Sequence, residues 1–130
     1  MSLNILITGC SSGIGAAMAK ELKKRGHNVF ATARRPETLE PLAELGIATL
    51  PLDVNDDESI ASAVAAVEEQ AGQLDMLGNN AGFSQVGAVV DLSREALRKH
   101  YETNVISPVS VSRAALPLLR AAARASGNAT

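Results

Sequence analysis

The strongest constraint on the fold is a glycine-rich segment that lies between an apolar run and a helical pattern. Residues 8–15 read Thr-Gly-Cys-Ser-Ser-Gly-Ile-Gly, after a mostly apolar run over residues 3–7 and before a helical pattern that ends near Lys24. A strand, a glycine-rich turn and a helix in this order bring free backbone N–H groups to a phosphate at the positive end of the helix dipole. The segment therefore predicts a phosphate site, although glycines can also serve only a tight turn and close packing.

Strand-like and helix-like segments alternate along most of the chain. We expect strands over residues 3–8, 28–33, 47–52 and 74–78, and helices over residues 14–24, 36–45 and about 56–72. Short connections between such segments imply right-handed crossovers, and hence an α/β fold with a Rossmann-type, doubly wound parallel sheet in the order 3-2-1-4. Pro51 favours an edge position for the third strand, because proline cannot donate to a ladder.

The last third of the chain is predicted to form two further helices. Ser93 caps a helix that extends to about Ser107, and a second helix covers about Val109 to Arg124, with Pro117 inside it as an expected kink. We expect residues 1–130 to form a single domain, because a chain of 130 residues with 46% hydrophobic residues can bury one core.

Composition excludes several classes of function. A net charge of −2 without a basic stripe argues against nucleic acid as a partner. The single cysteine, Cys10, excludes a disulfide framework and is typical of a reducing compartment; we expect it to fill a small space in the glycine loop. The N-terminal apolar run is too short for a signal peptide or a membrane span. We therefore expect a cytoplasmic chain without a membrane partner.

Two arginines follow the second predicted strand. In dinucleotide-binding folds, the position about 20 residues beyond the glycines reads the adenosine ribose: an acid there binds the 2′-hydroxyl and an arginine accommodates a 2′-phosphate. Arg34 and Arg35 stand near this position, and the next acid is Glu37. Because a guanidinium pairs with phosphate, the sequence favours NADP(H) over NAD(H). The alternative is two solvated arginines at the end of a strand.

Polar residues follow the third and fourth predicted strands, at the carboxyl edge where open α/β sheets bind ligands. Asp53 ends the third strand, the fourth is followed by Asn-Asn-Ala-Gly at residues 79–82, and Asn104 lies in Thr-Asn-Val on a later helix. With the glycine loop, these segments resemble the short-chain dehydrogenase/reductase family, in its N-terminal cofactor-binding part. The resemblance implies that Asp53 lies near the adenine, although the sequence allows equally that it belongs to the turn before the next helix.

The same resemblance implies the members of a cofactor site. The residues expected to bind the dinucleotide are Thr8, Gly9, Ser11, Ser12, Gly13, Ile14, Gly15, Arg34, Arg35, Asp53, Val54, Asn80, Ala81 and Gly82. By the same likeness, Asn104 would help to hold a proton-relay water, and it is the only candidate catalytic residue. No metal is expected.

The family's catalytic tyrosine and lysine are missing from this sequence. Family members use a Tyr-x-x-x-Lys pair, because an unperturbed tyrosine pKa near 10 is poorly matched to neutral pH, and an upstream serine polarises the substrate oxygen. Here the single tyrosine, Tyr101, is followed four residues later by Val105, and we expect it to be a packing aromatic. The sequence ends about where the family would begin its fifth strand.

We therefore expect the truncated, cofactor-binding half of an enzyme for reversible hydride transfer between a nicotinamide cofactor and a small alcohol or carbonyl substrate. This half alone should be inactive. Two alternatives remain: a non-catalytic nucleotide-binding or interaction module, and a different enzyme on a doubly wound fold, such as a methyltransferase.

The same reading predicts association between copies of the chain. The fourth strand becomes an edge, and the apolar helix residues Val109, Val111, Leu116 and Leu119 lose a covering layer. A homo-oligomer is therefore expected. Gly78, in the fourth strand, stands where the family usually has an apolar residue, and it should loosen that strand.

Overall fold

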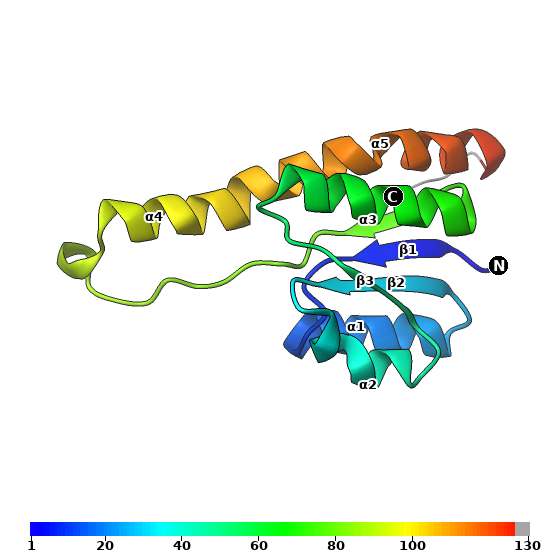
Figure 1. Cartoon of the computed structure of the whole chain (residues 1–130), viewed down its shortest axis with the longest axis horizontal. Coiled ribbons are helices and arrows are strands. Elements are labelled where there is room, and N and C mark those ends of the chain that lie inside the picture. The colour runs from blue at the N-terminus through cyan, green and yellow to red at the C-terminus, as the bar shows by residue number, and fades with distance from the viewer. Residues whose placement is uncertain (127–130) are drawn as a thin grey trace.

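A four-stranded parallel sheet forms the centre of the protein, in a computed structural model that describes residues 1–126 (Figure 1). The strands are β1 (Asn4–Ile7), β2 (Asn28–Ala33), β3 (Ala48–Pro51) and β4 (Met76–Gly78). Their order across the sheet is β3-β2-β1-β4, as predicted, and each neighbouring pair is parallel. Pro51 lies in β3, which is the predicted edge strand.

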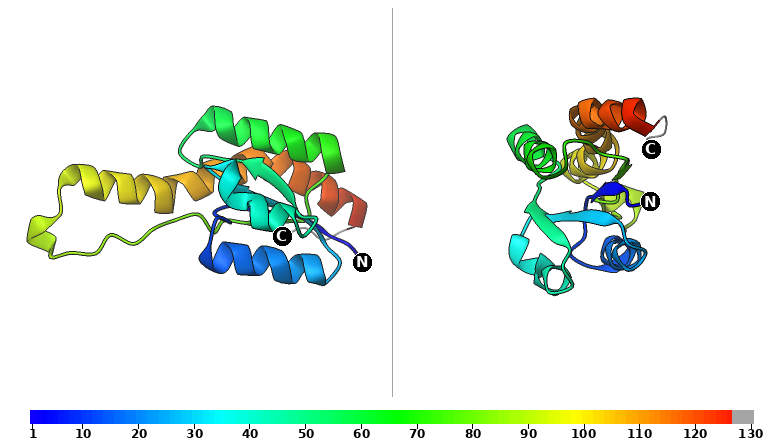
Figure 2. Two further views of the ribbon diagram at one scale, coloured as in Figure 1. Left: turned by 60° about the horizontal axis from the view of Figure 1, so that its bottom comes forward. Right: turned by 90° about the vertical axis from the view of Figure 1, so that its right-hand side faces the viewer.

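Helices cover both faces of the sheet (Figure 2). One face carries α1 (Gly13–Lys24), the short 3-10 turn η1 (Pro36–Leu39) and α2 (Glu40–Ala43). The opposite face carries α3 (Asp57–Ala71) and α5 (Ser107–Ser126). In the first layer, η1 and α2 take the place of the single helix that was predicted over residues 36–45.

The core consists of two apolar layers, one on each face of the sheet. Because side chains alternate along a strand, Ile5 and Ile7 of β1 pack under the first layer, among Leu39 and Leu42. Leu6 points the other way, into a cluster with Val67 and Leu118 on α3 and α5. Burial on both faces explains why these strands read as continuous apolar runs.

Helix α3 begins and ends with the signals that the sequence predicts. Asp56 is its N-cap, and the carboxylate accepts a hydrogen bond from the backbone N–H of Glu58 at 3.0 Å. Gly72 ends the helix in the left-handed conformation, with a φ of 72°, which glycine adopts without a steric cost. The long helix is thereby fixed at both ends.

The C-terminal third differs from the two separate helices that were predicted. Helix α4 (Arg94–Tyr101), capped by the Ser93 hydroxyl, runs through a π-helical segment, η3 (Glu102–Ile106), directly into α5. The backbone N–H and the hydroxyl of Ser107 both donate to the carbonyl oxygen of Glu102. This wider turn keeps the chain helical immediately before Pro108, which has no N–H to donate. Pro117 lies inside α5.

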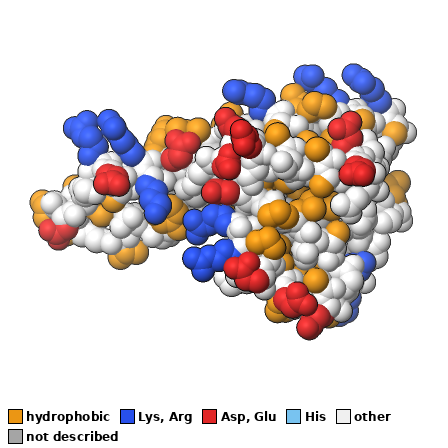
Figure 3. Space-filling model, viewed as in Figure 1, with side chains coloured by type: hydrophobic (Ala, Val, Ile, Leu, Met, Phe, Trp, Pro, Cys, Tyr) orange, Lys and Arg blue, Asp and Glu red, His pale blue; other side chains and the backbone are white. Residues whose placement is uncertain are grey.

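Residues 83–101, which we call the arm, extend away from the body of the protein (Figures 1 and 2). The arm consists of a loop with a short 3-10 turn, η2 (Val89–Asp91), and of α4. Several of its apolar side chains face solvent (Figure 3); the exposed fraction of Val90 is 90% and that of Tyr101 is 58%. The expectation that Tyr101 is a packing aromatic is therefore wrong, because more than half of the residue is exposed on the arm.

Two other expectations on packing are corrected or refined. Val111 is only 1% exposed, because α5 packs against α3, whereas Val109 and Leu116 do face solvent. At Gly78, an added Cβ would lie 3.6 Å from side-chain carbons of Ile7, which is an ordinary contact. The strand therefore has room for a Cβ at this position. Among the helices described, none is long and apolar enough to span a membrane.

Candidate functional site

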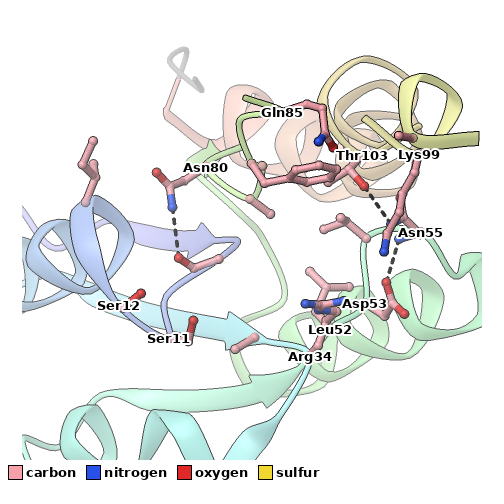
Figure 4. A pocket seen from close by; sticks show the side chains of 18 residues that line it. Ser11, Ser12, Arg34, Leu52, Asp53, Asn55, Asn80, Gln85, Lys99 and Thr103 are labelled. Carbon is pink, nitrogen blue, oxygen red and sulfur yellow. Dashed lines mark hydrogen bonds between the residues drawn. The ribbon is translucent and has the colours of Figure 1, made fainter. Parts of the chain in front are cut away.

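A cavity of about 810 Å³ opens at the carboxyl ends of the strands (Figure 4). Residues from the glycine loop, from the ends of β2 and β3, and from the loop after β4 form its wall. The predicted residues that line it are Gly9, Ser11, Ser12, Ile14, Arg34, Asp53, Val54, Asn80, Ala81 and Gly82. Segments that are far apart in the sequence thus meet at one edge of the sheet, as expected for an open α/β fold.

Thr8 is a buried anchor and does not line the cavity. Its hydroxyl oxygen accepts hydrogen bonds from the backbone N–H groups of Asn80 (3.0 Å) and Ala81 (2.9 Å). Thr8 therefore connects the end of β1 to the loop after β4, and it acts on the cavity through that loop.

The glycine loop and the asparagine loop are packed directly against each other. The side-chain amide of Asn80 donates to the carbonyl oxygens of Thr8 (3.2 Å) and Gly9 (3.0 Å). A Cβ at Gly9 would lie 2.8 Å from the Cα of Ala81, and one at Gly15 would meet the Gly9 carbonyl oxygen and lie 2.6 Å from the Asn80 amide nitrogen. These two glycines are therefore required by close packing.

Gly13 has a different environment from the other two glycines of the loop. It has a φ of +60°, and a Cβ built on it would have no neighbour within 4 Å. The first turn of α1 contains no acidic residue, and its N-cap, Ser12, makes no side-chain capping bond. Backbone N–H groups at this helix end are therefore free to bind an anion, and the helix dipole favours one.

Cys10 lies inside the loop, as expected. Its thiol is 1% exposed and donates to the carbonyl oxygen of Ile7 at 3.4 Å. Burial raises the pKa of the Cys10 thiol above its usual value. The sulfur is accordingly protonated at neutral pH, which makes it a poor nucleophile.

The two arginines after β2 have different positions. Both are exposed, but only Arg34 lines the cavity, and Arg35 does not. The single ion pair among residues 1–126 joins Arg25 to Glu21, so no carboxylate neutralises Arg34 in this part of the chain.

Asp53 forms the turn before α3, which is one of the two roles that the sequence left open. Its carboxylate accepts a hydrogen bond from the backbone N–H of Asn55 at 3.0 Å, and its own N–H donates to the Ser59 hydroxyl at 2.8 Å. These contacts form the turn that leads into α3. The residue also lines the cavity, so the turn holds a negative charge on the cavity wall.

Asn104 lies outside the cavity lining and holds the start of the arm. Its side chain accepts from the backbone N–H of Phe83 (3.0 Å) and donates to the Phe83 carbonyl oxygen (2.6 Å). The same amide nitrogen lies 2.8 Å from the Nε2 atom of His100, whose ring meets that of Phe83 edge-on. Asn79 points away, toward Ser112 on α5.

Sequence reasoning missed the part of the wall that comes from the arm and from the start of α3. The additional lining residues include Asn55, Phe83, Gln85, Ala96, Lys99 and Thr103. The Asn55 amide donates to the Thr103 hydroxyl (3.0 Å) and accepts from the Ser107 hydroxyl (2.6 Å), which joins the two elements. The helical spacing of Lys99 and Thr103 places them on one face, but only the position of α4 brings that face to the cavity.

Comparisons with known proteins give one consistent answer. A model of the short chain dehydrogenase family matches residues 3–129. A short-chain dehydrogenase/reductase of Pestalotiopsis microspora is 42% identical over 116 residues, which are 88% of this chain and 42% of that protein. Human dehydrogenase/reductase SDR family member 7 is 37% identical over 123 residues, which cover 87% of this chain and 36% of the human protein.

Solved structures agree with these sequences. A short-chain dehydrogenase from Streptomyces avermitilis has a TM-score of 0.88 at 38% identity, over 94% of this chain and 46% of that one. NADPH-bound carbonyl reductase from chicken fatty liver has a TM-score of 0.89 at 32% identity, and the match covers 95% of this chain and 54% of that one. NADH-dependent reductase A1-R′ has a TM-score of 0.85 at 30% identity, and the match covers 98% of this chain and 56% of that one. The chain spans about half the length of such relatives.

Proposed function

The chain belongs to the short-chain dehydrogenase family, and from this premise we propose that it is the NADP(H)-binding part of an oxidoreductase. The whole protein would catalyse reversible hydride transfer between the nicotinamide cofactor and an alcohol or carbonyl substrate. The choice of NADP(H) is supported by the position of Arg34. This residue lines the cavity and forms no ion pair within residues 1–126.

The residues around the cavity support this proposal. Ser11 and Ser12, which line the cavity, and the N–H groups at the start of α1 would bind the pyrophosphate at the positive end of the helix dipole. Arg34 would bind the 2′-phosphate, and Asp53 would lie near the adenine. The asparagine loop would border the inner ribose, and the cofactor, when bound, supplies or accepts the hydride. Arg35 and Asn104 stay in the proposal as outer members of the site.

The family alone does not decide between the two nicotinamide cofactors. One structural relative is described as NADPH-bound and another as NADH-dependent. The choice therefore depends on the charge of this chain at the end of β2. A guanidinium there can form charge-assisted hydrogen bonds with a 2′-phosphate, and these contribute about 1.5–3 kcal/mol each.

Calorimetric titration of the chain with NADPH and NADH tests the proposal. We expect NADPH to bind at least about tenfold more tightly, and Arg34→Ala to remove most of that preference. Arg35→Ala removes the same charge from an outer residue of the proposed site, which does not line the cavity, and it should cost less. Equal binding of both cofactors would contradict the proposed preference.

The same preparation, mixed with NADPH and a simple carbonyl substrate, should show no oxidation of the cofactor. The chain contains no Tyr-x-x-x-Lys pair, and Tyr101 lies on the exposed arm with Val105 four residues later. The chain therefore lacks the tyrosine and lysine that the family uses to donate the proton. Turnover would refute this part of the proposal. Binding without turnover in the presence of a complementary C-terminal half would favour the non-catalytic module instead.

A further inference from the structure

Three ionisable side chains line the cavity, and they come from three different elements. Arg34 follows β2, Asp53 follows β3, and Lys99 lies on α4. In Figure 4, Lys99 extends from α4 on the same side of the cavity as Asn55 and Asp53, while Ser11, Ser12 and Asn80 lie on the other side. The charged groups of the cavity therefore gather at the end where Arg34 and Asp53 would meet the adenosine.

The position of Lys99 follows from a chain of hydrogen bonds. Asp53 accepts from the backbone N–H of Asn55 (3.0 Å), and the Asn55 amide donates to the hydroxyl of Thr103 (3.0 Å). Thr103 stands four residues after Lys99 in the continuous helix, so the two side chains lie on one face. The Asp53 turn and the helix that carries Lys99 are thereby joined through Asn55.

Lys99 forms no ion pair within residues 1–126, so no carboxylate of this part of the chain, Asp53 included, lies within 4.0 Å of its ammonium group. Glu95 and Glu102 stand one turn away from it, yet no ion pair within 4.0 Å joins either to Lys99 in the described part of the chain. The side chain is exposed on the cavity wall. Its ammonium group is therefore free to act on charges inside the cavity.

Asp53 creates an electrostatic problem for the proposed cofactor. A carboxylate at the adenosine end repels a 2′-phosphate, and Arg34 alone has to overcome that repulsion. A second cation close to Asp53 would offset the carboxylate and leave the positive charge of Arg34 for the phosphate. Among the residues that line the cavity, Lys99 is the second cationic side chain, besides Arg34.

We propose that Lys99 is a specificity-determining residue, which offsets the charge of Asp53 and so allows the cavity to accept a 2′-phosphorylated adenine nucleotide. This inference rests on the proposed function and deepens it, because it assigns cofactor choice to a helix of the arm as well as to the end of β2. Lys99 acts through the electrostatics of the cavity and takes no part in hydride transfer.

The test is calorimetric titration of the full 130-residue chain and its variants with NADPH and NADH at low and moderate salt. We expect Lys99→Met to weaken NADPH binding about fivefold, and NADH binding less than about twofold. The effect should shrink as salt rises, because the groups are partly solvated. Arg98→Met is the matched control: it removes a cation from the neighbouring position, which does not line the cavity, and should change neither affinity appreciably.

A second substitution tests whether Lys99 acts through Asp53. Asp53→Asn keeps an oxygen that can accept from the Asn55 N–H, so the turn is preserved while the charge is removed. In this background, Lys99→Met should lose most of its effect on NADPH binding. An undiminished effect would mean that Lys99 binds a phosphate directly, and would overturn the inference. Equal losses for NADPH and NADH, or no loss for either, would also overturn it.

The outcomes separate this inference from the function on which it rests. A wild-type chain that binds neither cofactor, or binds both equally, contradicts the proposed NADP(H) function and with it the role of Lys99. A wild-type chain that prefers NADPH, with an unchanged Lys99→Met variant, refutes the role of Lys99 alone.

Discussion

At the scale of single residues, the Thr8 hydroxyl is the contact on which the arrangement of the two loops depends. The sequence suggests that Thr8 binds phosphate, but its side chain is buried and accepts from two backbone N–H groups of the asparagine loop. Both bonds are partly buried, and loss of the hydroxyl removes the acceptor from each N–H group. An unpaired buried donor costs about 1–3 kcal/mol.

Two substitutions of Thr8 should therefore distinguish the contribution of its side-chain volume from that of its hydrogen bonds. Thr8→Val keeps the volume and removes the acceptor, and we expect it to lower the free energy of unfolding by about 2 kcal/mol or more and to weaken cofactor binding. Thr8→Ser keeps the hydroxyl and should cost less. Urea denaturation followed by circular dichroism measures both. A valine variant as stable as the serine variant would contradict the anchoring role.

The site residues that could be predicted are those that a single short segment of the sequence identifies. The glycine loop, Arg34, Asp53 and the asparagine loop each follow a strand, so the sheet order alone brings them to the cavity. Lys99 and Thr103 carry no such local signal, since they line the cavity only through the placement of α4 and η3. Their contribution depends on tertiary placement, which local patterns do not encode.

At the scale of elements, the continuous helix from Arg94 to Ser126 is the main departure from the prediction. The sequence predicts a break near Ser107, whereas the chain passes through the π-helical segment Glu102–Ile106 without leaving the helix. Such segments are frequent at functional sites, and this one carries both Thr103 and Asn104. The strands and α3 were predictable because their caps and apolar runs are local. The π-helical segment has non-local contacts, since the hydroxyls of Thr103 and Ser107 bond to Asn55.

Removal of those contacts should loosen the π-helical segment. Asn55→Ala deletes the bonds to the hydroxyls of Thr103 and Ser107. We expect amide hydrogen exchange over residues 102–107 to become about tenfold faster, since two side-chain bonds of about 0.5–1.5 kcal/mol each are lost. Ser110→Ala, on the same helix but outside this network, is the control. Unchanged exchange in the Asn55 variant would show that the segment is stable by itself.

At the scale of the whole molecule, the arm and the open edge of the sheet are the features without a covering layer. Strand β4 pairs only with β1 among the described residues, and the arm exposes a group of valines. Exposed strand edges and apolar patches promote association. We therefore propose that the chain forms a homo-oligomer in solution.

Light scattering coupled to size exclusion tests this proposal. We expect a mass greater than one chain at micromolar concentrations, and a shift toward the monomer in a Val89→Ser, Val90→Ser double variant. Both side chains are almost fully exposed, so their loss should leave the fold intact. Leu45→Ser removes an exposed apolar side chain outside the arm and should have no such effect. A monodisperse wild-type monomer would refute the proposal.

The Thr8–Asn80 contact also has a consequence for the biosynthesis of the protein. The two residues are separated by 72 positions in the sequence, so the ring of chain that they close contains β2, β3 and α3. A nascent chain halted before residue 80 already contains the whole glycine loop and Arg34, yet lacks the partner that holds the loop in place. Non-local contacts of this kind form late, after the loop-closure entropy has been overcome. The ability to bind a nucleotide would then be acquired near the end of folding, and would report that the sheet has been completed.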